Sequence, residues 1–441
     1  MRFDQHDEWH ERTLRGGAAM KKQLRVAWFS PPPSEESSSI AAYFSHQLLP
    51  LMRDSVEIEL FHASINTRVE APVQSRHFLR AMAEHARRPF DLFFYQVEDC
   101  PSAFFSRYHL GIAPGLVLFH HYRFLTPPPV ALHHSSFEPV VEFVRGRRME
   151  LPNEQVWPEH RGPVARRELS LAGGLLFSQH RALEESYQFS EPRLVERPFT
   201  AFLPTPVSRR AEREDGAPSR LTIGLCGSPG MEGRAHKVLA ALARTPGVRL
   251  LWLLGDGERA AAEELIAEYG VEDRVALEEG RSPAAWQRLL PRIHIASHLH
   301  FSAFLSPAPY IEISLAHGVL VLASEPGEGG HLSEAVAFGV RPGEQEAQEL
   351  ALIFQRCSEN LPSRCEADYA NGPRAVAEEL LLSFEIVSRD MAALAPRWAE
   401  LRRSAWGDIE RRLNTPSFSR LGGLAPLASL RERRNGVEVP V

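Results

Sequence analysis

The stretch from Ile293 to Glu334 constrains the fold of this 441-residue chain more than any other. A short apolar run at 293–296 is followed by polar residues, as at the carboxyl end of a buried parallel strand. Tyr310–His317 carries apolar residues at helical spacing, and Gly318 follows directly, which is typical of a helix end. Val319–Ala323 is apolar throughout and predicts the next strand. Together these segments predict a strand–helix–strand unit of a parallel sheet.

The loop between the first strand and the helix of this unit is expected to open at the carboxyl edge of the sheet. Open α/β folds bind ligands at that edge, and a helix N-terminus there favours an anion such as a diphosphate. Ser306 and Pro307 lie in this loop, and Glu312 lies early in the helix. A carboxylate at that place can accept hydrogen bonds from sugar or ribose hydroxyls. The stretch therefore predicts a site for a phosphate-bearing ligand.

The rest of the chain repeats the alternation of apolar strands and helical segments, in two halves. Strands are predicted at 24–30, 56–61, 91–96, 116–120 and 175–178 in the first half, and at 221–226, 248–254 and 275–280 in the second. The segment 208–220 is polar, charged and free of apolar periodicity, which is typical of a linker. The fold class is therefore predicted to be α/β, with two Rossmann-like domains.

These boundaries divide the chain into six predicted parts. They are a disordered extension at 1–20, an N-terminal Rossmann-like domain at 21–207, a linker at 208–220, a C-terminal Rossmann-like domain at 221–382, a helical segment at 383–414 and a tail at 415–441.

Polar residues follow two of the predicted strands in the first half. Ser38 and Ser39 come just before a predicted helix at Ile40–Met52 and can offer hydroxyls and N–H groups to a ligand. His120 ends its strand, where a neutral imidazole can bond a sugar hydroxyl or assist proton transfer. Each has a plainer interpretation, a helix cap for the serines and a satisfied structural histidine for His120.

A glycine-rich turn that begins with Gly227 and Ser228 joins a strand to a helix in the second half. Such a turn can cradle phosphate, because its N–H groups and the helix N-terminus point the same way. Arg234 and Lys237 lie at the start of that helix, where they either pair with phosphate or face solvent. Arg281 lies in the loop after the third strand of this half.

The stretch 293–334 resembles the nucleotide-sugar site of the GT-B glycosyltransferases, most nearly the large retaining group called family 4. That group shows a strand, E-G-F-G-x-P-x-x-E, a helix with A-x-G, and then P-V-V-A-S. The matching residues are Pro309, Glu312, Ala316, Gly318, Val321, Ala323 and Ser324. The text LLGDG, which begins at Leu253, and the later GVEDRV are also similar to the group.

Several positions depart from the pattern of the group. Phe304 stands where the group has its first Glu, and Ser228 stands where it has an Arg. Ser38 and Ser39 stand where it has glycines. One inserted residue between Glu312 and the following glycine corresponds to about 100° of helical rotation.

The resemblance implies a GT-B fold, in which two Rossmann-like domains face each other across a cleft and the segment 383–414 packs back on the first domain. It implies transfer of a sugar from a nucleotide-diphosphate sugar, bound mostly by the C-terminal domain at 221–382, to an acceptor held by the N-terminal domain at 21–207, with retention and without a metal ion. His120 and Glu312 are the implied catalytic residues. The residues implied to bind the donor are Ser38, Ser39, Gly227, Ser228, Arg234, Lys237, Arg281, Ser306 and Pro307. No cofactor beyond the donor is implied, and the acceptor is a glycan, a lipid, a small molecule or a protein.

The departures leave two other functions open. The first is a catalytically inactive GT-B-like protein that serves as a binding or scaffold subunit. The second is another GT-B enzyme, such as a sugar-nucleotide epimerase, which needs an acid–base set that the sequence does not reveal.

Composition excludes several other classes. A net charge of −6 argues against a nucleic-acid binder. Four cysteines without metal-ligand spacing favour a reducing cytoplasm. No apolar run reaches the roughly 20 residues of a membrane span, although peripheral contact with a membrane stays open. The histidine pairs at 120–121 and 133–134 have no carboxylate at ligand spacing, which argues against a metal site.

Overall fold

The computed structural model describes residues 23–64, 69–122, 165–187, 194–207, 219–230, 233–299, 308–324, 337–363 and 372–413. The predicted extension at 1–20 and the predicted tail at 415–441 lie outside the described residues. All but the last two residues of the predicted linker at 208–220 also lie outside them.

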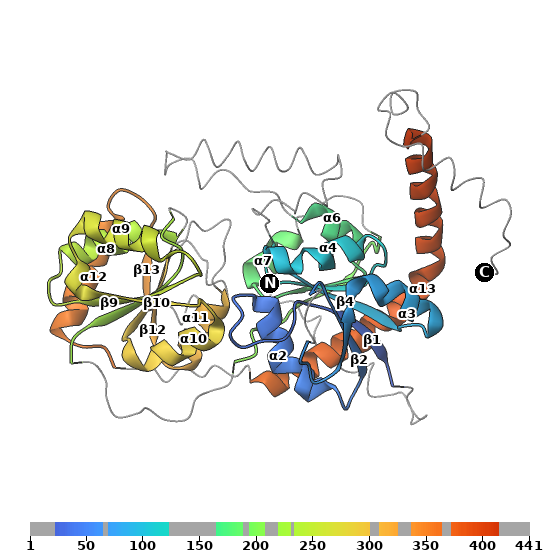
Figure 1. Cartoon of the computed structure of the whole chain (residues 1–441), viewed down its shortest axis with the longest axis horizontal. Coiled ribbons are helices and arrows are strands. Elements are labelled where there is room, and N and C mark those ends of the chain that lie inside the picture. Colours follow the sequence, from blue (N-terminus) through green and yellow to red (C-terminus); the bar gives the residue numbers. More distant parts are fainter. Residues whose placement is uncertain are drawn as a thin grey trace. The chain divides into compact units, whose positions relative to one another are not determined.

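Two sheets form the frame of the described chain, and every strand pairing within them is parallel (Figure 1). The first sheet has the order β3-β2-β1-β4-β5-β6-β7. Its strands are β1 (Arg25–Phe29), β2 (Glu57–His62), β3 (Gln74–His77), β4 (Leu92–Val97), β5 (Leu116–Phe119), β6 (Gly174–Phe177) and β7 (Phe199–Phe202). The strand order reverses between β1 and β4, so ligands are expected outside the carboxyl ends of these two strands.

The second sheet has the order β10-β9-β8-β11-β12-β13. Its strands are β8 (Thr222–Cys226), β9 (Arg249–Leu254), β10 (Val275–Glu279), β11 (Ile295–His298), β12 (Leu320–Ser324) and β13 (Phe338–Val340). The order reverses between β8 and β11. The two parallel sheets with interleaved helices confirm the predicted α/β class.

The strand–helix–strand unit predicted around 293–334 is confirmed. Strands β11 and β12 pair in parallel, with Ile295 opposite Leu320, and helix α11 (Ala308–Ala316) connects them. Gly318 has a φ of 69°, a left-handed conformation that glycine adopts at little cost after a helix. The pattern of apolar residues therefore predicted both the elements and their pairing.

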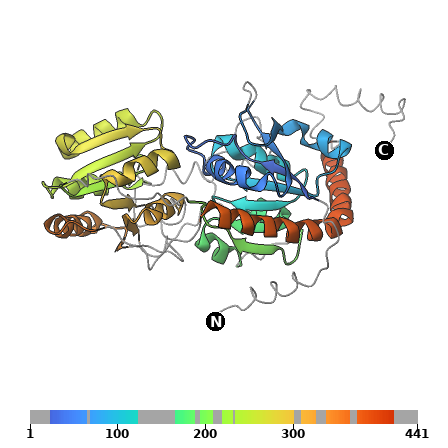
Figure 2. The same cartoon turned by 90° about the horizontal axis from the view of Figure 1, so that it is seen from below.

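Helices cover both faces of each sheet (Figures 1 and 2). The helices of the first half are α2 (Ile40–Met52), α3 (Ala81–Arg87), α4 (Phe104–Leu110), α6 (Arg166–Leu171) and α7 (His180–Ser186). Those of the second are α8 (Ala235–Ala243), α9 (Arg259–Tyr269), α10 (Pro283–Leu289), α11, α12 (Glu346–Glu359) and α13 (Pro373–Leu413). Short 3-10 helices lie at Phe78–Arg80, Pro101–Ala103, Glu272–Arg274 and Leu290–Arg292.

Alternation along the strands of the first sheet divides its core into two layers. Ala27 and Phe29 of β1 pack in the layer formed with α3, α4, α6 and α7. Trp28 points to the opposite face, where its ring contacts Phe94 and Phe384, the latter from α13. A Cβ on Gly174 of β6 would meet the Val387 side chain at 2.7 Å. The part of α13 up to Ser388 therefore packs on the first sheet, although it follows the second in the chain.

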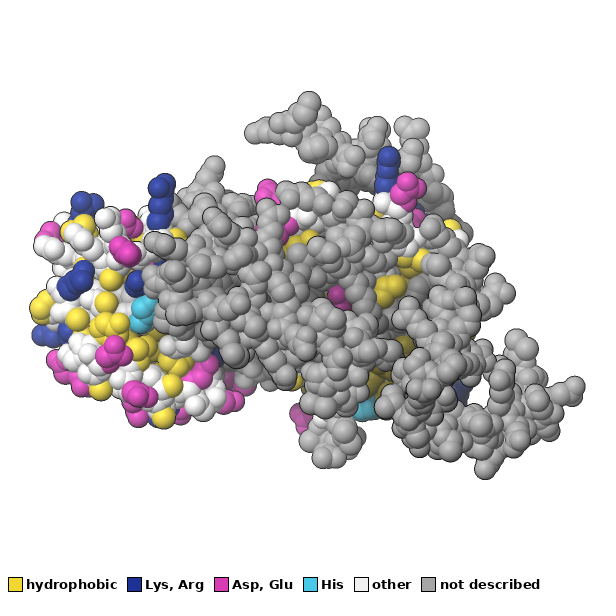
Figure 3. Space-filling model, turned by 90° about the horizontal axis from the view of Figure 1, so that it is seen from above, with side chains coloured by type: hydrophobic (Ala, Val, Ile, Leu, Met, Phe, Trp, Pro, Cys, Tyr) yellow, Lys and Arg dark blue, Asp and Glu magenta, His cyan; other side chains and the backbone are white. Residues whose placement is uncertain are grey.

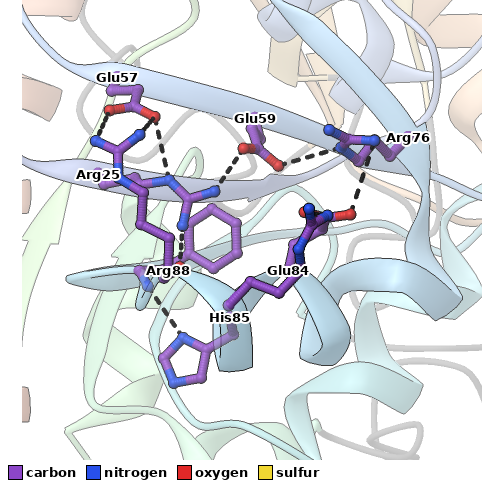
Figure 4. Close-up of polar contacts among 9 residues, drawn as sticks. Arg25, Glu57, Glu59, Arg76, Glu84, His85 and Arg88 are labelled. Carbon is purple, nitrogen blue, oxygen red and sulfur yellow. Dashed lines mark hydrogen bonds and ion pairs between the residues drawn. The ribbon is translucent and has the colours of Figure 1, made fainter.

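A network of charged side chains lies at the amino end of β1 (Figure 4). Arg25 is only 4% exposed, and its guanidinium lies 3.9 Å from the centre of the Phe90 ring. Arg25 donates to Glu59 Oε1 at 2.5 Å and to Glu57 Oε1 at 3.1 Å. Glu59 is also buried, and Arg76 Nε lies 3.5 Å from its other carboxylate oxygen. The network thus satisfies a charge that the hydrophobic core could not hold alone.

Candidate functional site

The carboxyl edge of the second sheet places a glycine after each of three adjacent strands. Gly227 follows β8 directly, Gly280 follows β10 directly, and Gly257 lies in the turn after β9. A Cβ built on any of these three glycines meets no atom within 4 Å. The Trp252 indole fixes the position of Gly227, because Nε1 donates a hydrogen bond to the Gly227 carbonyl oxygen at 2.9 Å. This edge can therefore take a ligand close to the main chain.

Arg281 and Glu258 place a pair of opposite charges beside this open backbone. Arg281 Nη1 lies 3.6 Å from Glu258 Oε2, and the Arg281 side chain is 30% exposed. Glu258 Oε2 also accepts a hydrogen bond from the Gly255 N–H at 2.7 Å, which fixes the turn after β9. The backbone N–H of Arg281 donates a hydrogen bond to the Leu254 carbonyl oxygen at 2.9 Å. The guanidinium is thus anchored at the edge and partly open to solvent.

Arg234, predicted as a phosphate ligand, lies inside the protein. Its side chain is 0% exposed, and its Nε donates to Glu346 Oε1 at 2.7 Å, with a second contact between Nη2 and Oε2. Arg234 has a φ of 51°, the only positive φ of a non-glycine residue in the described chain. The Arg234 guanidinium therefore forms an ion pair with Glu346 of α12. Its binding to the phosphate of a donor stays a prediction.

Lys237 and Ser228 contact the backbone of the segments that follow β13 and β8. Lys237 Nζ donates to the Gly343 carbonyl at 3.3 Å. The Ser228 hydroxyl accepts from the Gly230 N–H at 3.2 Å, so it stabilises the glycine-rich turn after β8. Ser306, Pro307 and Phe304 lie outside the described residues.

Glu312 of α11, predicted to bind sugar hydroxyls, is also buried. Glu312 is 0% exposed, and its Oε2 accepts a hydrogen bond from the backbone N–H of Thr205 at 2.9 Å. The carboxylate is therefore engaged with the chain segment that follows β7.

His120, the other predicted catalytic residue, is part of a buried chain of hydrogen bonds behind the carboxyl end of β5. Its Nε2 lies 2.7 Å from Gln96 Oε1, and Gln96 Nε2 donates to Ser45 Oγ at 2.7 Å. The Phe44 ring packs edge-on against the imidazole at 4.5 Å. Because the amide nitrogen of Gln96 points to Ser45, its oxygen faces His120, so His120 Nε2 carries the proton. Gln96 is thus a structural partner of His120, and the catalytic role of His120 stays a prediction.

The protein is expected to lose stability as the pH falls below about 6.5, the ordinary pKa of histidine. Burial, with a smaller effect of His121, holds the pKa of His120 well below its usual value. Burial and nearby His85 lower the pKa of His109 to about 4. Below pH 6.5 these histidines therefore bind protons in the unfolded chain but not in the folded protein. The free energy of unfolding falls by up to about 1.4 kcal/mol per pH unit for each histidine.

Urea unfolding at pH 7.0 and at pH 5.5 measures this loss of stability. His120→Gln removes one of the histidines whose pKa is lowered and should reduce the loss by its share, while His109, His62 and His85 retain theirs. Equal losses in the variant and in the unaltered protein would contradict the assignment.

Ser38 and Ser39 differ in their surroundings at the carboxyl edge of the first sheet. Ser38 is exposed, whereas Ser39 is the N-cap of α2 and its hydroxyl accepts from the Ala42 N–H at 3.2 Å. The Ser39 hydroxyl also donates to Glu98 Oε2 at 2.6 Å. Sequence reasoning missed Glu98, whose one signal is an acid directly after a buried strand.

Within the described residues, no group of three or more His, Cys, Asp and Glu side chains is arranged to hold a metal ion. None of the helices in that part of the chain has the length and apolar character to cross a membrane. On the face shown in Figure 3, the described surface carries basic side chains interspersed with acidic ones.

Comparison of structures identifies the fold. Sucrose-phosphate synthase from Thermosynechococcus elongatus is 15% identical with a TM-score of 0.52, and the match covers 88% of this chain and 100% of that one. HepE from Anabaena, solved with UDP-glucose, is 16% identical with a TM-score of 0.52 over 84% and 100% of the two chains. WaaG, a glycosyltransferase involved in lipopolysaccharide biosynthesis, is 12% identical with a TM-score of 0.51 over 83% and 98%.

These likenesses confirm the predicted fold: the chain has the two-sheet GT-B fold of the glycosyltransferases. At such low identity they establish the fold alone. The sequence itself matches no family profile and no curated protein.

Proposed function

We propose that this protein binds a nucleotide-diphosphate sugar at the carboxyl edge of the second sheet and transfers the sugar to an acceptor. The observation that carries the proposal is the open backbone at Gly227, Gly257 and Gly280, with Arg281 beside it. The shared fold with HepE, which was solved with UDP-glucose, and with sucrose-phosphate synthase supports it.

In this reaction the bond between the anomeric carbon and the diphosphate oxygen breaks, and a bond to an acceptor oxygen forms. The acceptor hydroxyl loses its proton, and the nucleoside diphosphate leaves with the bonding electrons. Backbone N–H groups of the turn after β8, with Lys237 and Arg281, would stabilise the charge that develops on the diphosphate. Retention, independence from metal ions and cofactors, and a cytoplasmic location rest on the sequence alone.

A catalytically inactive binding protein is the second candidate. It is favoured by one observation: His120, Arg234 and Glu312 are each 0% exposed and bonded within the chain. The two candidates share a nucleotide site and differ in turnover. Release of nucleoside diphosphate from the bound donor, in the presence of candidate acceptors, separates them.

Thermal unfolding against a panel of nucleoside diphosphates and nucleotide sugars tests the proposed site. A ligand at 100 times its Kd adds about 2.7 kcal/mol to the stability of the protein that binds it. We expect one nucleotide class to raise the midpoint, and Gly227→Val to weaken its binding by at least about tenfold. A Cβ at Gly227 meets no protein atom within 4 Å, so the added side chain enters the space that the ligand would occupy.

Gly247→Val is the matched control for this substitution. Gly247 lies between α8 and β9, at the amino end of β9, and a Cβ there also meets nothing within 4 Å. The control should bind nucleotide as the unaltered protein does. Binding that is equal in both variants would place the ligand elsewhere, and no binding by the unaltered protein would reject the proposed function.

A further inference from the structure

The N-terminus of α2 lies at the switch point of the first sheet and is occupied by a side chain of the protein itself. Helix α2 follows β1, and Glu98 is the first residue after β4, the neighbour of β1. The Ile40 N–H donates to Glu98 Oε1 at 2.9 Å, and the Ala41 N–H donates to Glu98 Oε2 at 3.2 Å. The Ser39 hydroxyl adds a third hydrogen bond at 2.6 Å. The carboxylate thus occupies the position where a helix N-terminus would receive an external anion.

Burial makes this arrangement a fixed part of the first sheet. Glu98 is 2% exposed and Ser39 is 4% exposed. The next N–H of the helix, that of Ala42, is satisfied by the Ser39 hydroxyl. The donors that a phosphate needs at this helix end are therefore already used.

We propose that Glu98 is a built-in anion that excludes phosphate from the first sheet, so that the ligand bound beside α2 is uncharged there. A phosphate at this place would have to displace a buried carboxylate and leave its charge without donors, which is strongly unfavourable. The proposal rests on the proposed function in one respect: the diphosphate of the donor is then held by the second sheet alone. Glu98 in this account determines specificity and takes no part in the chemistry.

The consequence concerns the class of acceptor. Because the Glu98 carboxylate already uses the donors of this helix end, a phosphorylated or carboxylated group of an acceptor finds no free donor there. A neutral, hydroxyl-bearing portion, as of a sugar, is compatible with the exposed Ser38 hydroxyl at the same edge.

Inorganic phosphate is the probe that tests this inference on the full chain. The backbone amide signals of Ile40 and Ala41 in ¹⁵N TROSY spectra report the helix end directly, at constant ionic strength. The variants are Glu98→Ala, which removes the carboxylate, and Glu98→Gln, which keeps an acceptor oxygen and nearly the same shape. Glu35→Gln is the matched control, because it removes the same charge from an exposed residue of the preceding loop.

In the unaltered protein and in Glu35→Gln, phosphate should leave both amide signals in place. In Glu98→Ala the signals should shift and saturate with phosphate, because the helix end becomes free for an external anion. If the alanine variant does not fold, the glutamine variant should show the same shift at higher phosphate concentration.

Phosphate-dependent shifts of Ile40 and Ala41 in the unaltered protein would overturn the inference, and so would their absence in a folded Glu98 variant. This result is separate from the proposed function. A protein that binds no nucleotide would reject a donor site on the second sheet, while the phosphate titration at α2 would keep its meaning.

Discussion

Replacing Arg234 with alanine is expected to destabilise the part of the protein around the second sheet by about 3–5 kcal/mol, the usual cost of breaking a buried ion pair. The Arg234 and Glu346 side chains are 0% and 1% exposed. Without the guanidinium, the Glu346 carboxyl group is left in a site closed to water, with neither an ion-pair partner nor solvent to stabilise its charge. Thermal unfolding should show the loss as a midpoint lowered by about 2–4 °C for each kcal/mol.

Two companion variants separate the ion pair from the backbone conformation. Arg234→Gly loses the same pair but relieves a left-handed residue with a φ of 51°, so it should be about 1 kcal/mol more stable than Arg234→Ala. Combining Arg234→Met with Glu346→Leu removes both charges and should recover most of the stability. An Arg234→Ala protein as stable as the unaltered one would contradict the structural role of Arg234. It would favour the predicted role of Arg234 as a phosphate ligand.

Arg25→Ala is expected to have a similar effect on the first sheet, again about 3–5 kcal/mol. Arg25 joins β1 to Glu57 and Glu59 of β2 (Figure 4). Its guanidinium stacks on the Phe90 ring. Its loss leaves the buried Glu59 carboxylate with Arg76 as its remaining partner, at 3.5 Å. Urea unfolding monitored by circular dichroism measures the change.

Arg88→Ala provides the control within the same network. Arg88 also pairs with Glu57, but the two side chains are 65% and 34% exposed. Exposed pairs contribute about 0–1 kcal/mol, because water already solvates both charges. Comparable losses in Arg25→Ala and Arg88→Ala would show that burial is not what makes the Arg25 contacts important.

The sequence predicted the fold well where strands are buried on both faces. The apolar runs that became β1, β4, β8, β9 and β12 are continuous, as strands of a covered parallel sheet must be. The strands β3, β7 and β13, each at the edge of its sheet, were missed. The four residues of β3 are Gln74, Ser75, Arg76 and His77, and β13 has three residues, so neither carries a periodic apolar signal.

The candidate site was less predictable, because side-chain partners depend on which strands become neighbours. Arg234 has the spacing of a phosphate ligand, yet Glu346, 112 residues later, pairs with it inside the protein. Glu98 gave no sign of its contact with α2, because only the pairing of β1 with β4 brings the two together. Motif spacing predicts that a charged residue lies near a ligand-binding edge, but it cannot predict whether an internal partner already occupies that residue.

The most direct test of the central claim is a crystal structure of the protein with the nucleoside diphosphate that stabilises it best. The proposed donor site predicts density for the diphosphate at the carboxyl edge of the second sheet, against the backbone at Gly227 and Gly257, and none at the N-terminus of α2. A diphosphate bound at Ile40 and Ala41 in place of the Glu98 carboxylate would contradict it, and so would a ligand that leaves the edge of the second sheet empty.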